Sequence, residues 1–187
     1  MKWAPVFAAG VLVGAGAMAL PKLAVHLHAA LGGGHGTGRG ARVHTEERFT
    51  FLARAPMERV APLFGADKER SWAPGWNPQF VYPVPAVDQQ GMVFTVKHNH
   101  LKAAWANTAF DTKNGRFQYV YLIPDAVVTV ITIQLTPQVD RTRVEVVYDR
   151  TALSAGADDD VRHMAEQDRV SGPEWEKQIN EYLAASR

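Results

Sequence analysis

Between residues 47 and 150 the chain alternates between apolar and polar side chains in short runs that are typical of β-strands. At 144–148, for example, apolar residues occupy every second position and charged residues or valine stand between them. Gln90-Gly91 and Asn114-Gly115 separate such runs and are typical of tight turns. The pattern predicts an antiparallel meander with strands at 47–52, 79–84, 92–98, 101–112, 116–123, 127–136 and 141–150.

Helical periodicity flanks these strands. Residues 56–65 predict a short helix that Pro62 interrupts, and a second short helical piece follows at 67–72. After the last strand, three consecutive aspartates at 158–160 favour a helix N-terminus, and an apolar stripe then continues almost to the C-terminus. We expect Pro173 to kink this C-terminal helix or to divide it in two.

The N-terminus has a different character. Residues 3–20 carry no charge, and eighteen such residues are close to the roughly 20 that a membrane-spanning helix needs. We interpret residues 1–31 as a membrane-spanning segment, because apolar residues continue beyond Lys22, whose amine can reach the interface. Two alternatives remain: a signal peptide cleaved near Ala19, and a buried core helix, which its glycines disfavour.

Details of this segment predict how it is arranged. Gly10 and Gly14 form a small-xxx-small pattern that permits a weak homodimer of spanning helices. The distribution of Lys and Arg slightly favours a cytoplasmic position for the C-terminal part, whereas cleavage of the segment would place that part on the opposite side. Six glycines at 32–40 predict a flexible tether over 32–43, followed by a folded domain at 44–187.

Composition excludes several functions. The 187 residues contain 20 basic and 19 acidic side chains, a net charge of +1, so the chain is a poor candidate for binding nucleic acid. The absence of cysteine excludes disulfides, thiolate zinc sites and cysteine nucleophiles. No dinucleotide fingerprint, phosphate-binding glycine loop or Gly-x-Ser-x-Gly motif is present, and we expect no cofactor.

The element order is strand, two short helices, six antiparallel strands and a C-terminal helix. With the patterns Phe49-Thr50-Phe51, Pro56-x-x-x-Val60-x-x-Leu63-Phe64 and Glu69-Arg70-x-Trp72, this order resembles the START-like helix-grip superfamily over residues 44–186. That superfamily includes polyketide cyclase/dehydrase-like proteins and birch-pollen-allergen-like ligand binders. The resemblance implies an α+β fold, in which a curved sheet of about seven strands surrounds a long C-terminal helix, beside the N-terminal apolar helix.

The resemblance also implies an internal cavity. The leading hypothesis is a non-enzymatic, membrane-tethered module that binds an apolar small molecule or lipid. The alternative is a cyclase/dehydratase-type enzyme in which a cavity His or Tyr moves protons on a polyketide-like substrate. A nearly all-apolar lining would favour carriage, whereas a buried His–Asp or His–Tyr pair would favour chemistry. The candidate cavity residues are Phe94, Val96, His98, Phe110, Tyr119, Tyr121, Tyr148, Asp168, Trp175 and Ile179.

Three of these assignments carry alternatives. Trp105 and Phe110 lie five residues apart, so they share a face only if a bulge separates them; otherwise Phe110 is expected to point inward. His98 continues the face of Phe94, but we expect no metal site there, because no third ligand is marked by spacing. Asp168 continues the helical register of Val161, which would point it inward, but the break before Pro173 resets that register and favours a position toward solvent.

Overall fold

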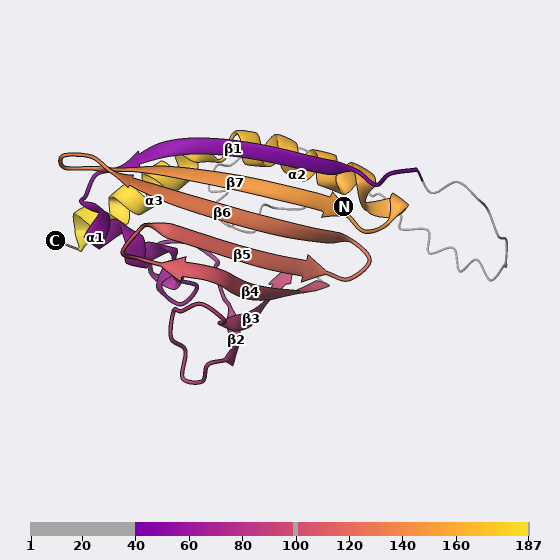
Figure 1. Ribbon diagram of the computed structural model, residues 1–187, viewed down its shortest axis with the longest axis horizontal. Helices are drawn as coiled ribbons and strands as arrows, with labels where there is room; N and C mark the ends of the chain where they lie inside the picture. Colours follow the sequence, from indigo (N-terminus) through magenta and orange to yellow (C-terminus); the bar gives the residue numbers. More distant parts are fainter. Residues whose placement is uncertain (1–39, 99–100, 187) are drawn as a thin grey trace, which may run out of the picture.

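The computed structural model describes residues 40–98 and 101–186. These residues build one antiparallel sheet of seven strands in the order β1-β7-β6-β5-β4-β3-β2, drawn from top to bottom in Figure 1. Every neighbouring pair except β1–β7 is joined by consecutive chain, so the predicted meander is confirmed. The strands are β1 His44–Ala53, β2 Gln79–Tyr82, β3 Val93–His98, β4 Leu101–Asp111, β5 Arg116–Ile123, β6 Val127–Pro137 and β7 Thr142–Ala152.

The helices connect and close this sheet. The helix predicted at 56–65 is one α-helical turn, α1 Met57–Val60, followed by the 3-10 helix η1 Ala61–Phe64. Pro62 explains the change, because its nitrogen cannot donate the next α-helical hydrogen bond. The second predicted piece is the 3-10 helix η2 Lys68–Ser71.

The C-terminal helix is divided in two, as Pro173 predicts. After the 3-10 turn η3 Ala155–Ala157, α2 spans Asp158–Arg169 and α3 spans Gly172–Ala185. Pro173 lies in the first turn of α3, where a backbone N–H would have no intrahelical acceptor, so its missing N–H does not destabilise the helix. A new helix can therefore begin at this point. Both helices lie along the same side of β1 and β7 (Figure 1).

The hydrophobic core lies between the sheet and these helices. Trp175 of α3 lies at its centre, with ring centroids 5.6 Å from Phe49, 6.5 Å from Phe64 and 5.7 Å from Trp72. Rings from the first strand, the short helices and the last helix therefore meet, which explains why segments far apart in the sequence fold as one unit.

A β-bulge corrects the expected face of β4. The register between β4 and β5 shifts between Asn107 and Ala109, so one extra residue enters β4. Trp105 is buried and Phe110 half-buried, with its ring edge-on to Phe117 at 5.2 Å. The bulge that reconciles Trp105 with Phe110 is therefore present, and the case of an uninterrupted strand with Phe110 alone pointing inward does not apply.

The predicted membrane segment at 3–20 and most of the tether at 32–43 lie outside the described residues. Within residues 40–98 and 101–186, no helix combines the length and the apolar character needed to cross a bilayer.

Candidate functional site

Most predicted cavity residues lie together on the face of the sheet that the helices cover. Phe94 and Trp105 stack at 5.6 Å between ring centroids, and Trp105 stacks on Tyr121 at 4.4 Å. For His98, the structure describes the backbone at the end of β3 but not the side chain. The predicted residues that are buried on this face are Phe94, Val96, Tyr119, Tyr121 and Tyr148, and those buried on the helices that cover it are Asp168, Trp175 and Ile179.

Asp168 faces the interior, where it forms a buried ion pair with Arg150. The guanidinium donates from Nε to Oδ2 at 2.7 Å and from Nη2 to Oδ1 at 2.9 Å. Its Nη1 donates to Thr129 Oγ1 at 3.0 Å and to the Tyr121 hydroxyl. The guanidinium also lies 4.6 Å from the centroid of the Tyr148 ring. Asp168 thus connects to Tyr121, another of the predicted cavity residues, through an arginine.

Arg150 was not among the predicted site residues, although the strand pattern contained a signal for it. It has the same parity on β7 as Val144, Val146 and Tyr148, all of which are buried. A charged side chain is usually expected outside, because burying an unpaired charge is costly. The bidentate contact with Asp168 removes that objection, and it links α2 to three strands of the sheet.

A second buried polar group is Glu69 on η2, which the sequence prediction also missed. Its side chain is 1% exposed, and neither carboxylate oxygen has a hydrogen-bond partner among the described residues. Burial, followed by the nearby charge of Asp88, holds the pKa of Glu69 well above its usual range. The carboxyl therefore tends to keep its proton and to act as a neutral hydrogen-bond donor.

Local structure holds Glu69 in this position. The indole nitrogens of Trp72 and Trp76 each donate to a backbone carbonyl, of Leu63 and Ala66, at 2.7 Å. Trp72 follows Glu69 at a helical spacing of three residues, whereas Trp76 lies beyond the end of η2. That spacing to one buried tryptophan is the sequence signal from which the burial of Glu69 could have been predicted.

Asp88 supports the same segment from the loop after β2. Its carboxylate accepts hydrogen bonds from the backbone amides of Asp67 at 2.9 Å and Lys68 at 3.1 Å. Gly65 makes room for it, because a Cβ at that position would lie 2.1 Å from Asp88 Oδ2. Asp88 is half-buried, and this desolvation raises its pKa in spite of the hydrogen bonds from the amides.

Tyr119 and Asn107 complete a polar cluster with Glu69 and Asp88, which we call the Glu69 cluster. Tyr119 and Asn107 face each other across β5 and β4. The Tyr119 hydroxyl and the Asn107 Oδ1 atom are buried without a hydrogen-bond partner among the described residues. Burial raises the pKa of Tyr119 well above its usual value, and the charges of Glu69 and Asp88 add to that effect. The cluster therefore contains two O–H groups with raised pKa values, in addition to the buried Arg150–Asp168 pair.

Two recesses open on the surface of the described residues. One, of about 530 Å³, lies at the β2–β3 end of the sheet and is lined by Gly75, Asn77, Gln79, Val96 and Lys97. Val96 also belongs to the predicted cavity face, so this recess lies beside that face. No three His, Cys, Asp or Glu side chains within 40–98 and 101–186 are arranged to hold a metal ion.

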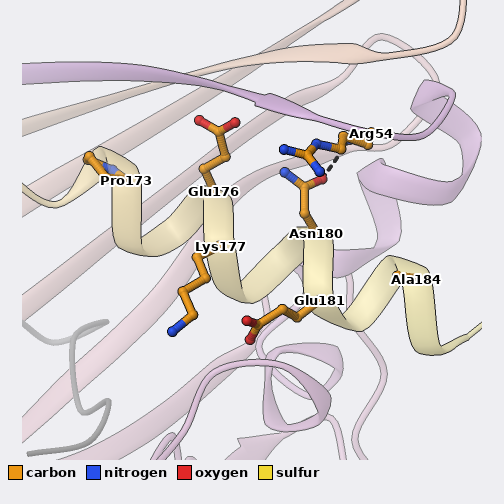
Figure 2. Close-up of a pocket in the computed structure, with 7 residues that line it drawn as sticks. All are labelled: Arg54, Pro173, Glu176, Lys177, Asn180, Glu181 and Ala184. Atoms are coloured by element: carbon orange, nitrogen blue, oxygen red, sulfur yellow. Dashed lines mark hydrogen bonds between the residues drawn. The ribbon is translucent and has the colours of Figure 1, made fainter.

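Figure 2 shows the second recess, of about 510 Å³, along the outer side of α3. Glu176, Lys177 and Glu181 surround it, so its rim is charged and suits an apolar ligand poorly. Asn180 clamps α3 to β1 there: its Oδ1 accepts from the Arg54 amide at 2.7 Å, and its Nδ2 donates to the Leu52 carbonyl at 2.9 Å. We therefore place the candidate site at the Glu69 cluster.

The architecture defines the chain as an α+β helix-grip domain with a partly polar interior. Comparison with known proteins supports this fold. The norcoclaurine synthase of Thalictrum flavum, in complex with dopamine and hydroxybenzaldehyde, superposes with a TM-score of 0.58 at 12% identity, covering 81% of this chain and 95% of that one. The allergen Ara h 8.0201 gives 0.52 at 12% identity, covering 76% and 99%.

A third similar structure is the Mll3558 protein from Rhizobium loti, with a TM-score of 0.51 at 20% identity, covering 79% of this chain and 100% of that one. No protein-family model and no curated protein matches the sequence. Identities this low establish the helix-grip fold and nothing more specific.

Proposed function

We propose that the chain is a membrane-tethered binding module that holds an apolar small molecule or lipid between the sheet and α3. One observation carries the proposal: on an aromatic face, the Glu69 carboxyl and the Tyr119 hydroxyl are buried without hydrogen-bond partners among the described residues. Buried polar groups in proteins nearly always have a partner, and each exception calls for an explanation such as a bound molecule.

The chemistry of the cluster indicates the ligand class. A neutral carboxyl and a phenol both donate to an oxygen, so they suit a carbonyl or hydroxyl oxygen on the ligand. Rings such as Phe94 and Trp105 suit an apolar or aromatic body. The ligand is therefore an apolar molecule that carries one polar oxygen. A related fold in complex with dopamine and hydroxybenzaldehyde supports the idea that this architecture accommodates aromatic molecules.

Binding can be tested with the full-length chain in detergent and the neutral apolar fluorophore N-phenyl-1-naphthylamine. Native mass spectrometry of the purified protein should first reveal a co-purified ligand. Competition with the fluorophore then measures the affinity of the protein for that ligand. Glu69→Leu should lower this affinity by roughly 5- to 150-fold, which corresponds to about 1–3 kcal/mol for a lost buried hydrogen bond. Glu174→Leu, at a partly exposed position on α3, is the control.

The same experiment contains its refutation. Equal affinity in the Glu69 and Glu174 variants would show that the ligand, if present, does not use the Glu69 cluster. A full-length chain that carries no ligand and takes up no fluorophore would refute the binding function itself.

A cyclase/dehydratase-type enzyme is the second candidate, and one observation favours it. Burial raises the pKa of the Glu69 carboxyl well above its usual range, and this carboxyl belongs to the same cluster as Tyr119. A carboxyl with a raised pKa is the kind of group that can protonate a substrate oxygen. Glu69→Gln distinguishes the two functions, since an amide still donates a hydrogen bond but cannot transfer a proton. In a binding module this variant should retain most of the affinity, whereas in an enzyme it should bind the substrate and lose turnover.

Membrane attachment rests on the charge-free residues 3–20. Full-length protein should stay with membranes during alkaline carbonate extraction and keep its N-terminus. A released form that begins at Leu20 would instead establish the signal-peptide alternative.

A further inference from the structure

Four large apolar side chains are exposed within seven consecutive residues at the open edge of the sheet. Val81 and Tyr82, at the end of β2, are 58% and 59% exposed; Val84 and Val87, in the loop that follows, are 75% and 51% exposed. We call residues 81–87 the apolar loop. It projects beyond the β2 edge at the bottom of Figure 1. Contiguous apolar surface of this kind marks an interaction site.

The apolar loop is poorly suited to pairing with another β-strand. β2 is the last strand of the sheet and leaves one side open, which in general invites edge-to-edge pairing. Pro83 and Pro85 follow immediately and have no N–H to donate, so a further strand cannot continue along this edge. A second copy of the chain, or a strand-forming peptide, is therefore a weak fit.

Its chemistry fits a lipid surface instead. The chain carries no charged residue from Ser71 to Val87, and Tyr82 is a residue type that favours the boundary between lipid and water. One flanking charge is basic, since Lys97 lines the adjoining recess. The Arg70 guanidinium lies 4.8 Å from the centroid of the Phe80 ring and pairs with Asp67 at 3.2 Å. Asp88, which directly follows the apolar loop in sequence, accepts hydrogen bonds from backbone amides. Apolar side chains beside a lysine suit a bilayer that contains anionic lipid.

We propose that the apolar loop inserts into a lipid bilayer and brings the β2–β3 recess to the lipid surface. This inference rests on the proposed function: a ligand with an apolar body partitions into bilayers, so an entrance beside lipid gives it access without crossing water. Gln79, the first residue of β2, lines the recess, and the apolar loop begins two residues later. The opening and the inserting surface are therefore adjacent.

The chain is long enough to allow this contact in the tethered protein. The predicted tether at 32–43 separates the proposed membrane segment from β1. At about 3.3–3.6 Å per residue its twelve residues reach at most about 40 Å, more than the roughly 30 Å diameter of a small domain, so the domain can turn its loop onto the same bilayer.

The absence of cysteine makes the test specific, because a single introduced cysteine carries the only fluorophore. Full-length Val84→Cys and Val87→Cys are labelled with the environment-sensitive dye NBD and reconstituted in vesicles of phosphatidylcholine and phosphatidylglycerol. Val139→Cys is the matched control. It is a 96% exposed valine in the β6–β7 hairpin, at the far left of Figure 1.

We expect emission at positions 84 and 87 to rise about twofold or more over detergent-free buffer, and nitroxide-labelled lipids to quench it. The label at position 139 should show neither the increase in emission nor the quenching, even though all three proteins carry the same N-terminus. Labels at 84 and 87 that stay in water, or all three labels responding alike, would overturn the proposal. An increase in emission with protein concentration in the absence of vesicles would also overturn the proposal, because a second copy of the chain would then cover the apolar loop.

This outcome is separate from that of the proposed function, because ligand binding is measured without vesicles. Ligand bound at the Glu69 cluster with an unresponsive loop would refute lipid insertion alone. A responsive loop on a chain that binds no ligand would refute the binding function alone.

Discussion

Replacing Asp168 with Asn removes the negative charge from the buried pair with Arg150 and keeps the size of the side chain. The two side chains are 1% and 2% exposed, so water cannot replace the lost charge. Arg150 would keep its contacts with Tyr121 and Thr129. It would lose the bidentate carboxylate, however, and remain as a buried cation without a counter-ion.

The expected magnitude follows from that burial. Removing one partner of a buried ion pair costs about 3–5 kcal/mol. For a domain of about 150 residues, each kcal/mol shifts Tm by roughly 2–4 °C, so Tm should fall by about 6–20 °C. Arg150→Met combined with Asp168→Leu should recover most of the loss, because no charge then stays buried.

Thermal and urea unfolding followed by circular dichroism measure both effects. The control is Asp159→Asn, which breaks the ion pair between Asp159 and Arg162. The Asp159 side chain is 97% exposed. Exposed pairs contribute about 0–1 kcal/mol, so this variant should unfold almost like the parent. If Asp168→Asn lost no more stability than Asp159→Asn, the buried pair would not hold α2 to the sheet.

Three further variants test the site and its supports. Burial keeps the pKa of Glu69 above the usual 4.5, so the folded chain holds a proton that the unfolded chain releases. The contribution of Glu69 to the free energy of unfolding should therefore be fully present below about pH 4.5. Above that pH the free energy of unfolding should fall by up to about 1.4 kcal/mol per pH unit, until the pH passes the raised pKa. Urea titrations of Glu69→Gln should show no such dependence on pH. Gly65→Ala should cost about 1–3 kcal/mol in thermal melts by displacing Asp88, whereas Gly156→Ala, with its nearest atom at 3.9 Å, should not. Asn180→Ala should cost a similar amount by freeing α3 from β1, seen as faster amide exchange in α3.

Placing the site required information that local pattern does not contain. Trp105 shows this most simply: strand alternation alone puts it on the face opposite Phe110, and the bulge near Asn107 reverses that relation. A bulge adds one residue to a strand and leaves little trace in composition. The sequence raised it only as an alternative.

Buried charges show the same limit. Arg150 and Glu69 occupy positions whose periodicity points inward, yet residue type argues for the surface. Whether Arg150 is buried depends on Asp168, which is 18 residues later and on a different element. Such pairing is a property of tertiary contact, and for Glu69 the structure shows burial without any pairing among the described residues.

The sequence by itself determined the element order, the antiparallel connections and most of the inward-facing residues. These follow from the periods of strand and helix, from Asn-Gly and Gln-Gly at turns, and from Pro62 and Pro173 at helix breaks. Local sterics and the burial of apolar side chains decide such features within a few residues of each position. Only the tertiary structure decided which polar groups meet inside, because Glu69, Tyr119 and Asn107 come from three elements that the curved sheet brings together.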